Sequence, residues 1–237
     1  MVILRSALWY LTTAITVILW TLFVYMAFPF GYKATLNTAR SWSTLMLWLT
    51  RWICGIRYEI IGRENLKKPV IFFSKHQSAW ETIVFPGLLP MNCFVCKKSL
   101  LNIPVFGWSM RITKHIPIDR TQGMQALKSV IREGQNRLNL GISIVIFPEG
   151  TRVAPHQHPK FHKSGSALAK ATGAPIIPIA LNAGQCWRRN SFLKYPGKVT
   201  VVIGPAFDTQ GKSVDEINDT MYAWIKENTI KLEGPES

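Results

Sequence analysis

His76 and Glu81 have the residue types and the spacing that a proton transfer needs. A histidine can take a proton from a hydroxyl near neutral pH, and a neighbouring carboxylate fixes the imidazole tautomer and stabilises the imidazolium that forms. On a straight helix, two residues five positions apart point about 140° away from each other. The pair therefore predicts general-base chemistry only if the chain turns between the two residues.

The surrounding residues predict such a turn. Residues 70–74 form an apolar run typical of a buried strand, and residues 79–85 begin a helix that Pro86 interrupts, which leaves His76 between strand and helix. Ser78 and Glu81 also fit the S-x-x-E capping box, in which the glutamate reaches back to the first turn. Glu81 is then either a capping residue alone or a cap that also orients His76, and the two roles are compatible.

A second polar motif follows a run of β-branched residues and consists of Glu149, Gly150, Thr151 and Arg152. The run at 142–147 predicts another buried strand, Pro148 ends it, and Gly150 permits a left-handed turn. The motif then lies at the carboxyl end of a strand, where open α/β sheets bind ligands. An arginine fork matches phosphate oxygens, which makes Arg152 and Arg120 candidates for binding a phosphate. The alternative is a polar turn with a solvated arginine.

Together these motifs resemble those of the glycerolipid acyltransferases of the 1-acylglycerol-3-phosphate acyltransferase type. That family has a histidine, four residues and an acid, followed by a Glu-Gly-Thr-Arg block. Further blocks that agree in order and spacing are Lys97-Lys98, Ile103 to Trp108, Ile118 to Arg120, and Pro175 to Ala180. The resemblance covers roughly residues 70 to 181. The usual acid is aspartate, and Glu81 is one methylene longer but still supplies a carboxylate.

The resemblance implies an acyltransferase that moves a fatty acyl chain to the sn-2 hydroxyl of 1-acylglycerol-3-phosphate and gives phosphatidic acid. The donor would be acyl-CoA or acyl carrier protein, with no further cofactor. The resemblance assigns His76 and Glu81 to catalysis. The residues assigned to substrate binding are Lys98, Phe106, Gly107, Arg120, Glu149, Gly150, Thr151 and Arg152. Because a carboxylate repels a phosphate, we expect Glu149 to position Arg152 or a backbone turn.

The first 56 residues predict a membrane-anchoring element. Residues 7–30 carry no charge and are long enough to cross a hydrocarbon core of about 30 Å, and residues 41–56 mix aromatic residues with arginines as interfacial helices do. A spanning helix and a half-embedded hairpin both remain open. Basic residues gather after the first apolar segment, which by the positive-inside rule predicts a catalytic domain on the cytoplasmic side, at a bacterial inner membrane.

Residues 57–230 predict one α/β domain with a mostly parallel sheet flanked by helices. Strands alternate with helical segments at 121–138, 164–172 and 214–230. Residues 231–237 are expected to form a loose tail.

The net charge of +15 fits an anionic lipid, a phosphorylated substrate and an acidic donor. Dispersed basic residues without a recognisable module do not indicate a nucleic-acid partner. His156, His158 and His162 lack a nearby acid or thiol, and Cys93 and Cys96 would face opposite ways on a strand, so neither a metal site nor a disulfide is expected. A transferase for another lysolipid, such as a lyso-aminolipid, and a non-enzymatic anion-binding membrane scaffold remain alternatives. The sequence does not indicate an oligomeric state.

Overall fold

A computed structural model describes residues 1–67 and 69–235, apart from the side chain of Arg120. The described strands form a seven-stranded sheet in the order β1-β7-β6-β2-β5-β3-β4. Their bounds are β1 Ile56–Ile61, β2 Ile71–Ser74, β3 Asn92–Lys97, β4 Ile116–Ile118, β5 Ser143–Ile146, β6 Ile176–Leu181 and β7 Gly197–Ile203. Every neighbouring pair is parallel except β6 and β7. The mostly parallel sheet predicted from the sequence is confirmed.

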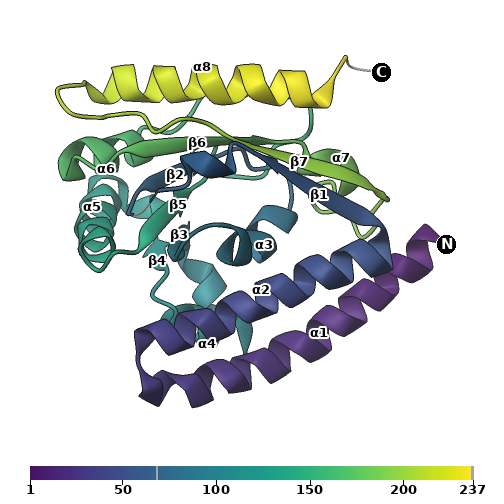
Figure 1. The fold of residues 1–237 in the computed structure, drawn as a ribbon. Helices are drawn as coiled ribbons and strands as arrows, with labels where there is room; N and C mark the ends of the chain where they lie inside the picture. Colours follow the sequence, from purple (N-terminus) through teal and green to yellow (C-terminus); the bar gives the residue numbers. More distant parts are fainter. Residues whose placement is uncertain (68, 236–237) are drawn as a thin grey trace.

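Helices cover both faces of this sheet (Figure 1). Their bounds are α1 Val2–Ala27, α2 Tyr32–Cys54, α3 Trp80–Leu88, α4 Phe106–Ile112, α5 Gly123–Asn139, α6 Ser164–Thr172, α7 Ala183–Cys186 and α8 Val214–Glu233. Phe73 packs with α5, α6 and α8, whereas its neighbour Phe72 packs with the helices of the opposite face, α1, α2 and α3. Cys93 and Cys96 on β3 likewise belong to opposite faces, and both are buried and free.

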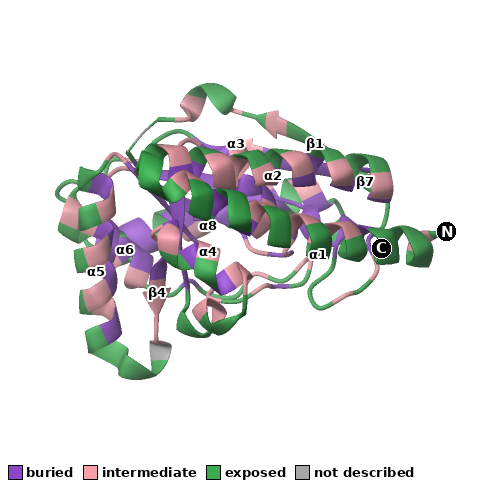
Figure 2. Ribbon diagram, turned by 90° about the horizontal axis from the view of Figure 1, so that it is seen from below, coloured by how far each residue is buried: buried purple, intermediate pink, exposed green. Residues whose placement is uncertain are grey.

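The N-terminal helices α1 and α2 form an antiparallel hairpin that shares its core with the α/β domain. Trp9, Met46 and Leu47 are buried in the same apolar cluster as Phe72. The outward side of α1 exposes many large apolar residues (Figure 2). Among the described residues, the segment Val2–Phe30 is long and apolar enough to cross a membrane, by length and composition alone.

Three helix boundaries differ from those predicted. The second helix begins at Tyr32, well before residue 41, because Gly31 at φ +92° turns the chain there. Helix α3 continues through Pro86 to Leu88, since a proline near the end of a short helix removes only one backbone hydrogen bond. The expected tail from residue 231 is wrong for its first three residues, because α8 runs to Glu233 and Glu233 is buried. Residues 236 and 237 lie outside the described part.

Candidate active site

The two polar motifs meet at one edge of the sheet because the strands before them are neighbours. β2 pairs in parallel with β5, so the residues after Ser74 and those after Ile146 leave the sheet side by side. The turn of residues 75–79 then enters α3, and the loop of residues 147–153 lies against it. The predicted position of His76, between a strand and a helix, is confirmed.

Three contacts hold His76 against the second motif. Its backbone N–H donates to Oε2 of Glu149 at 2.8 Å, and its backbone carbonyl accepts from the N–H of Val153 at 2.8 Å. The imidazole stacks on the ring of Phe147, with centroids 3.9 Å apart and planes at 16°. The position and the plane of the imidazole are therefore set by the loop that follows β5.

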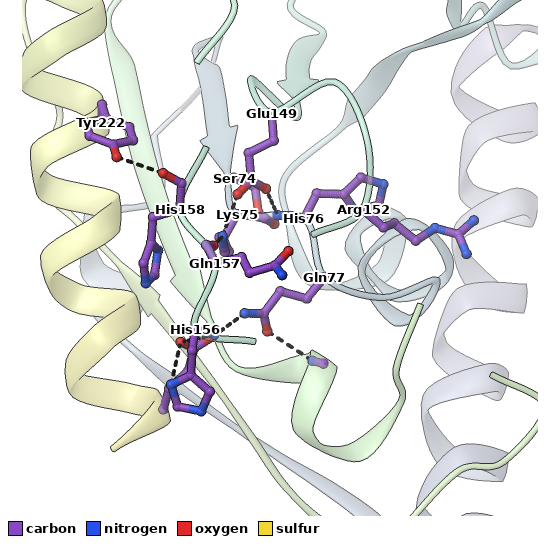
Figure 3. A network of polar contacts seen from close by, with 12 residues as sticks. Ser74, Lys75, His76, Gln77, Glu149, Arg152, His156, Gln157, His158 and Tyr222 are labelled. Carbon is purple, nitrogen blue, oxygen red and sulfur yellow. Dashed lines mark hydrogen bonds and ion pairs between the residues drawn. The ribbon is translucent and has the colours of Figure 1, made fainter. Parts of the chain in front are cut away.

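A buried ion pair lies directly behind this turn. Nζ of Lys75 is 2.5 Å from Oε1 of Glu149 and also donates to the backbone carbonyl of Gln157 at 2.8 Å (Figure 3). Both side chains are almost completely buried, so each charge depends on the other. Glu149 therefore stabilises a backbone turn. This is one of the two roles expected for it from the sequence.

Glu81 binds the backbone of the same turn. Its Oε1 accepts from the N–H groups of Gln77 at 2.8 Å and Ser78 at 3.0 Å, while Oγ of Ser78 accepts from the N–H of Trp80 at 3.1 Å. The glutamate half of the predicted capping box is therefore formed, whereas Oγ of Ser78 binds the N–H of Trp80 and not that of Glu81, and the N-cap of α3 is Ala79. Nδ1 of His76 is buried and has no hydrogen-bond partner among the described residues. The turn amides thus hold the carboxylate, and the contact expected between Glu81 and His76 is not formed in this structure.

Burial and nearby positive charge keep the imidazole neutral. Burial is the largest effect and Arg152, Lys75 and Arg189 add to it, together lowering the pKa of His76 to about 3. Burial raises the pKa of Glu81 to about 8, against the opposing effect of the N–H groups that it accepts from. A histidine that is neutral at pH 7 has the protonation state of a general base.

A cavity of about 330 Å³ opens beside His76. His76, Gly150 and Arg152 line it together with further polar residues such as Asn92 and Lys97, and Figure 3 shows the Arg152 side chain pointing away from the Lys75–Glu149 pair. The apolar wall comes from the N-terminal hairpin, α3, β3 and α4, and includes Val24, Leu36, Trp42, Pro86, Phe94 and Met110. The cavity therefore joins a base and a cation to a surface suited to a hydrocarbon chain.

Comparison with known proteins identifies the family. Residues 57–182 match the family model described as acyltransferase. This chain belongs to the acyltransferase family. It is 40% identical to a 1-acyl-sn-glycerol-3-phosphate acyltransferase of Pseudomonas aeruginosa over 97% of this chain and 91% of that protein. A protein of the same name from Limnanthes alba is 30% identical over 86% of this chain and 73% of its own.

The fold agrees with a solved structure. The crystal structure of the 1-acyl-sn-glycerophosphate acyltransferase PlsC from Thermotoga maritima matches with a TM-score of 0.84 at 22% sequence identity, over 100% of this chain and 98% of the other. The match includes the N-terminal hairpin, so the whole described chain has the fold of that protein.

Only some of the predicted substrate residues of this acyltransferase line the cavity. Phe106, Gly150 and Arg152 line the cavity. Lys98 and Thr151 are exposed and are not among the lining residues, although Lys97 is. Gly107 packs against the backbone, since an added Cβ would lie 2.4 Å from the carbonyl oxygen of Leu101. The side chain of Arg120 lies outside the described residues.

Sequence analysis missed several residues that shape this acyltransferase site. Lys75 follows the predicted strand at 70–74, and Phe147 is the last residue of the predicted strand at 142–147. Lys75 pairs with Glu149, and Phe147 stacks on the imidazole of His76. A lysine at the end of an otherwise apolar strand was the available signal, because such a charge is buried only with a partner. The apolar cavity wall has no motif, since it is assembled from separate elements.

The neutral state of His76 leads to a prediction that does not depend on turnover. In the full chain labelled with ¹⁵N-histidine, the imidazole signal that disappears in His76→Ala should remain that of the neutral form from pH 7.5 down to about pH 5. An ordinary histidine would be half protonated near pH 6.5. A titration midpoint of His76 between pH 6 and 7 would show that the site is more hydrated or more negative than the structure indicates.

Proposed function

We propose that this chain transfers a fatty acyl group from acyl-CoA or acyl carrier protein to the sn-2 hydroxyl of 1-acylglycerol-3-phosphate, giving phosphatidic acid. The cavity is the observation that carries the proposal. Its lining combines a neutral histidine and an arginine with many apolar side chains. An acyl thioester has a hydrocarbon chain that fits the apolar side chains. A phosphorylated alcohol has a hydroxyl for the base and a phosphate for the arginine.

In the proposed reaction, His76 acts as the general base. It takes the acceptor's hydroxyl proton as that oxygen attacks the thioester carbonyl, and returns the proton to the thiolate sulfur when the carbon–sulfur bond breaks. No acyl-enzyme forms, because the acceptor oxygen attacks the donor directly. In this proposal Glu81 orients His76 through the turn, since it accepts from the backbone N–H groups of the next two residues, Gln77 and Ser78.

Arg152 grips the acceptor phosphate in this proposal, and Arg120 assists it. Arg152 lines the cavity beside His76 and its positive charge contributes to the low pKa of that histidine. Its backbone carbonyl accepts from Nη1 of Arg189 at 2.9 Å, so the loop carrying the guanidinium is itself anchored. A planar guanidinium offers two parallel N–H groups to phosphate oxygens, which an ammonium does not.

Replacement of Arg152 by lysine tests this assignment. The substitution should raise the KM for the acceptor about 10- to 100-fold, because a hydrogen bond to a charged group contributes about 1.5–3 kcal/mol. The KM for the thioester donor should change less than twofold. The matched control is Arg132→Lys on α5, an exposed arginine remote from the cavity, which should leave both constants unchanged. Equal losses for donor and acceptor would assign Arg152 a structural role.

The exposed apolar face of α1 supports membrane association, and we infer that it lies in the cytoplasmic leaflet of a bacterial inner membrane. Nζ of Lys194 lies 4.4 Å from the ring centroid of Trp9 and 3.7 Å from that of Tyr10, which ties the start of α1 to the α7–β7 loop. A helix fixed along the catalytic domain favours a hairpin embedded in one leaflet. The acceptor then reaches the cavity from the same surface.

An assay of thiol release separates the enzyme from a non-enzymatic scaffold. The full chain in detergent is mixed with acyl-CoA, and free CoA is followed before and after 1-acylglycerol-3-phosphate is added. The proposal expects release that depends on the acceptor and yields phosphatidic acid. Binding of the lysolipid without thiol release would support the scaffold. Faster thiol release with a lyso-aminolipid than with 1-acylglycerol-3-phosphate would show that the preferred acceptor is a different lysolipid.

A further inference from the structure

The carboxyl end of α8 lies against the turn that carries His76, although the two are far apart in sequence. Glu233, the last residue of α8, has a completely buried side chain. Its Oε1 accepts from Nε2 of Gln77, 156 positions away, and its Oε2 accepts from the backbone N–H of His156 at 2.9 Å. The backbone carbonyl of Glu233 accepts from Nε2 of Gln185 at 2.9 Å. The helix end is therefore fixed at several points.

Gln77 connects this helix end to the catalytic turn. It follows His76 directly, is fully buried, and its backbone N–H donates to Glu81. Its side-chain Oε1 accepts from the N–H of Gly184 at 3.0 Å while Nε2 donates to Glu233. Figure 3 shows the Gln77 amide lying between the His156 loop and α7. Both ends of the amide are thus held, which leaves the turn little freedom to shift.

Packing alone does not account for a carboxylate at this position. A buried carboxylate loses its hydration, and at the carboxyl end of a helix it also faces the negative end of the helix dipole. A second carboxylate, that of Glu149, is close enough for the two charges to repel each other. A neutral side chain of the same size would avoid these costs. The carboxylate offers one oxygen to Nε2 of Gln77 and the other to the backbone N–H of His156, and this second oxygen lies 3.7 Å from Nδ1 of His156.

We propose that Glu233 is a positioning residue for acyl transfer and acts through Gln77 on the placement of His76. This inference rests on the function proposed above. The carboxylate fixes the Gln77 amide, the amide fixes the turn between β2 and α3, and the turn aims the imidazole at the acceptor hydroxyl. Neither Glu233 nor Gln77 lines the cavity, so their loss should affect the rate of the chemical step and leave substrate binding intact.

A double-mutant cycle tests the coupling. In Glu233→Gln the new NH₂ group faces either Nε2 of Gln77 or the backbone N–H of His156, so one donor loses its acceptor, and Gln77→Glu places two carboxylates face to face. Each should lower kcat about 10- to 100-fold with both KM values within twofold, because small misplacements of a reacting group have effects of this size. In the double variant the amide at position 233 donates to the carboxylate at position 77, which reverses the wild-type hydrogen bond. The N–H groups of Gly184 and His156 still find acceptors. The double variant should recover kcat to within about threefold of the wild type.

The control on the same helix is Glu227→Gln, an exposed residue paired with Lys231, which should keep wild-type kcat. Amide hydrogen exchange of the peptide covering residues 75–81 gives a readout independent of activity. It should be faster in each single variant and return to the wild-type rate in the double variant. If wild-type protein transfers no acyl group, the proposed function fails while exchange still decides whether Glu233 holds the turn. Unchanged exchange in the single variants, or a kcat unaltered per folded molecule, would overturn the positioning role.

Discussion

His76→Ala should lower the rate of acyl transfer about 10²- to 10⁴-fold, the usual consequence of losing a general base. The folded structure should survive, because Nδ1 makes no hydrogen bond with the described residues and the backbone contacts of His76 to Glu149 and Val153 do not need the side chain. Acceptor binding should be preserved, since Arg152 is untouched. Initial rates with saturating donor and acceptor, together with a thermal melt, measure both properties.

The matched control is His162→Ala, which removes an exposed imidazole from a nearby loop and keeps the backbone hydrogen bond of that residue to Pro148. It should retain wild-type activity. A His76→Ala protein that turns over within tenfold of the wild type would remove His76 from the mechanism, and a collapsed melting temperature would show that the ring's stacking on Phe147 is needed for folding.

Removing one partner of the Lys75–Glu149 pair should have the largest effect on stability. Glu149→Gln leaves the buried ammonium of Lys75 without its counter-charge, which costs about 3–5 kcal/mol. For a chain of this size that corresponds to a fall in Tm of roughly 6–20 °C. Differential scanning calorimetry of the full chain in detergent measures the shift.

The exposed pair of Glu59 and Lys198 provides the control, because Glu59→Gln should cost less than about 1 kcal/mol. Combining Lys75→Met with Glu149→Gln removes both charges and should restore much of the lost stability. If the single Glu149 variant melts within 2 °C of wild type, the pair does not hold the two motifs together as described.

The chemistry at the sheet edge was predictable because each motif is local. A short apolar strand followed by a turn places His76, and the same pattern places Gly150, whose φ of +72° fits the left-handed turn that its sequence permits. A parallel sheet brings both turns to one edge, so their proximity follows from the fold class. The capping role of Glu81 also follows from its distance of three residues from Ser78.

What could not be predicted depends on contacts between distant residues. The charge of Lys75 is balanced by a glutamate 74 positions away, and Gln77 is held by a residue 156 positions away. Glu233 fell within the expected tail of residues 231–237, whereas the fold buries its side chain. The cavity wall combines residues of the hairpin, α3, β3 and α4, and no single segment carries its pattern.

The most direct test of the proposed function is acyl transfer with matched acceptors. Full-length protein in detergent receives a labelled acyl-CoA or labelled acyl carrier protein, with either 1-acylglycerol-3-phosphate or the corresponding monoacylglycerol, which has the hydroxyl but lacks the phosphate. We expect labelled phosphatidic acid from the phosphorylated acceptor, at least tenfold slower reaction of the monoacylglycerol, and transfer by His76→Ala that is about 10²- to 10⁴-fold slower than by the wild type. Equal use of the two acceptors, or no transfer from either donor to any lysolipid, would contradict it.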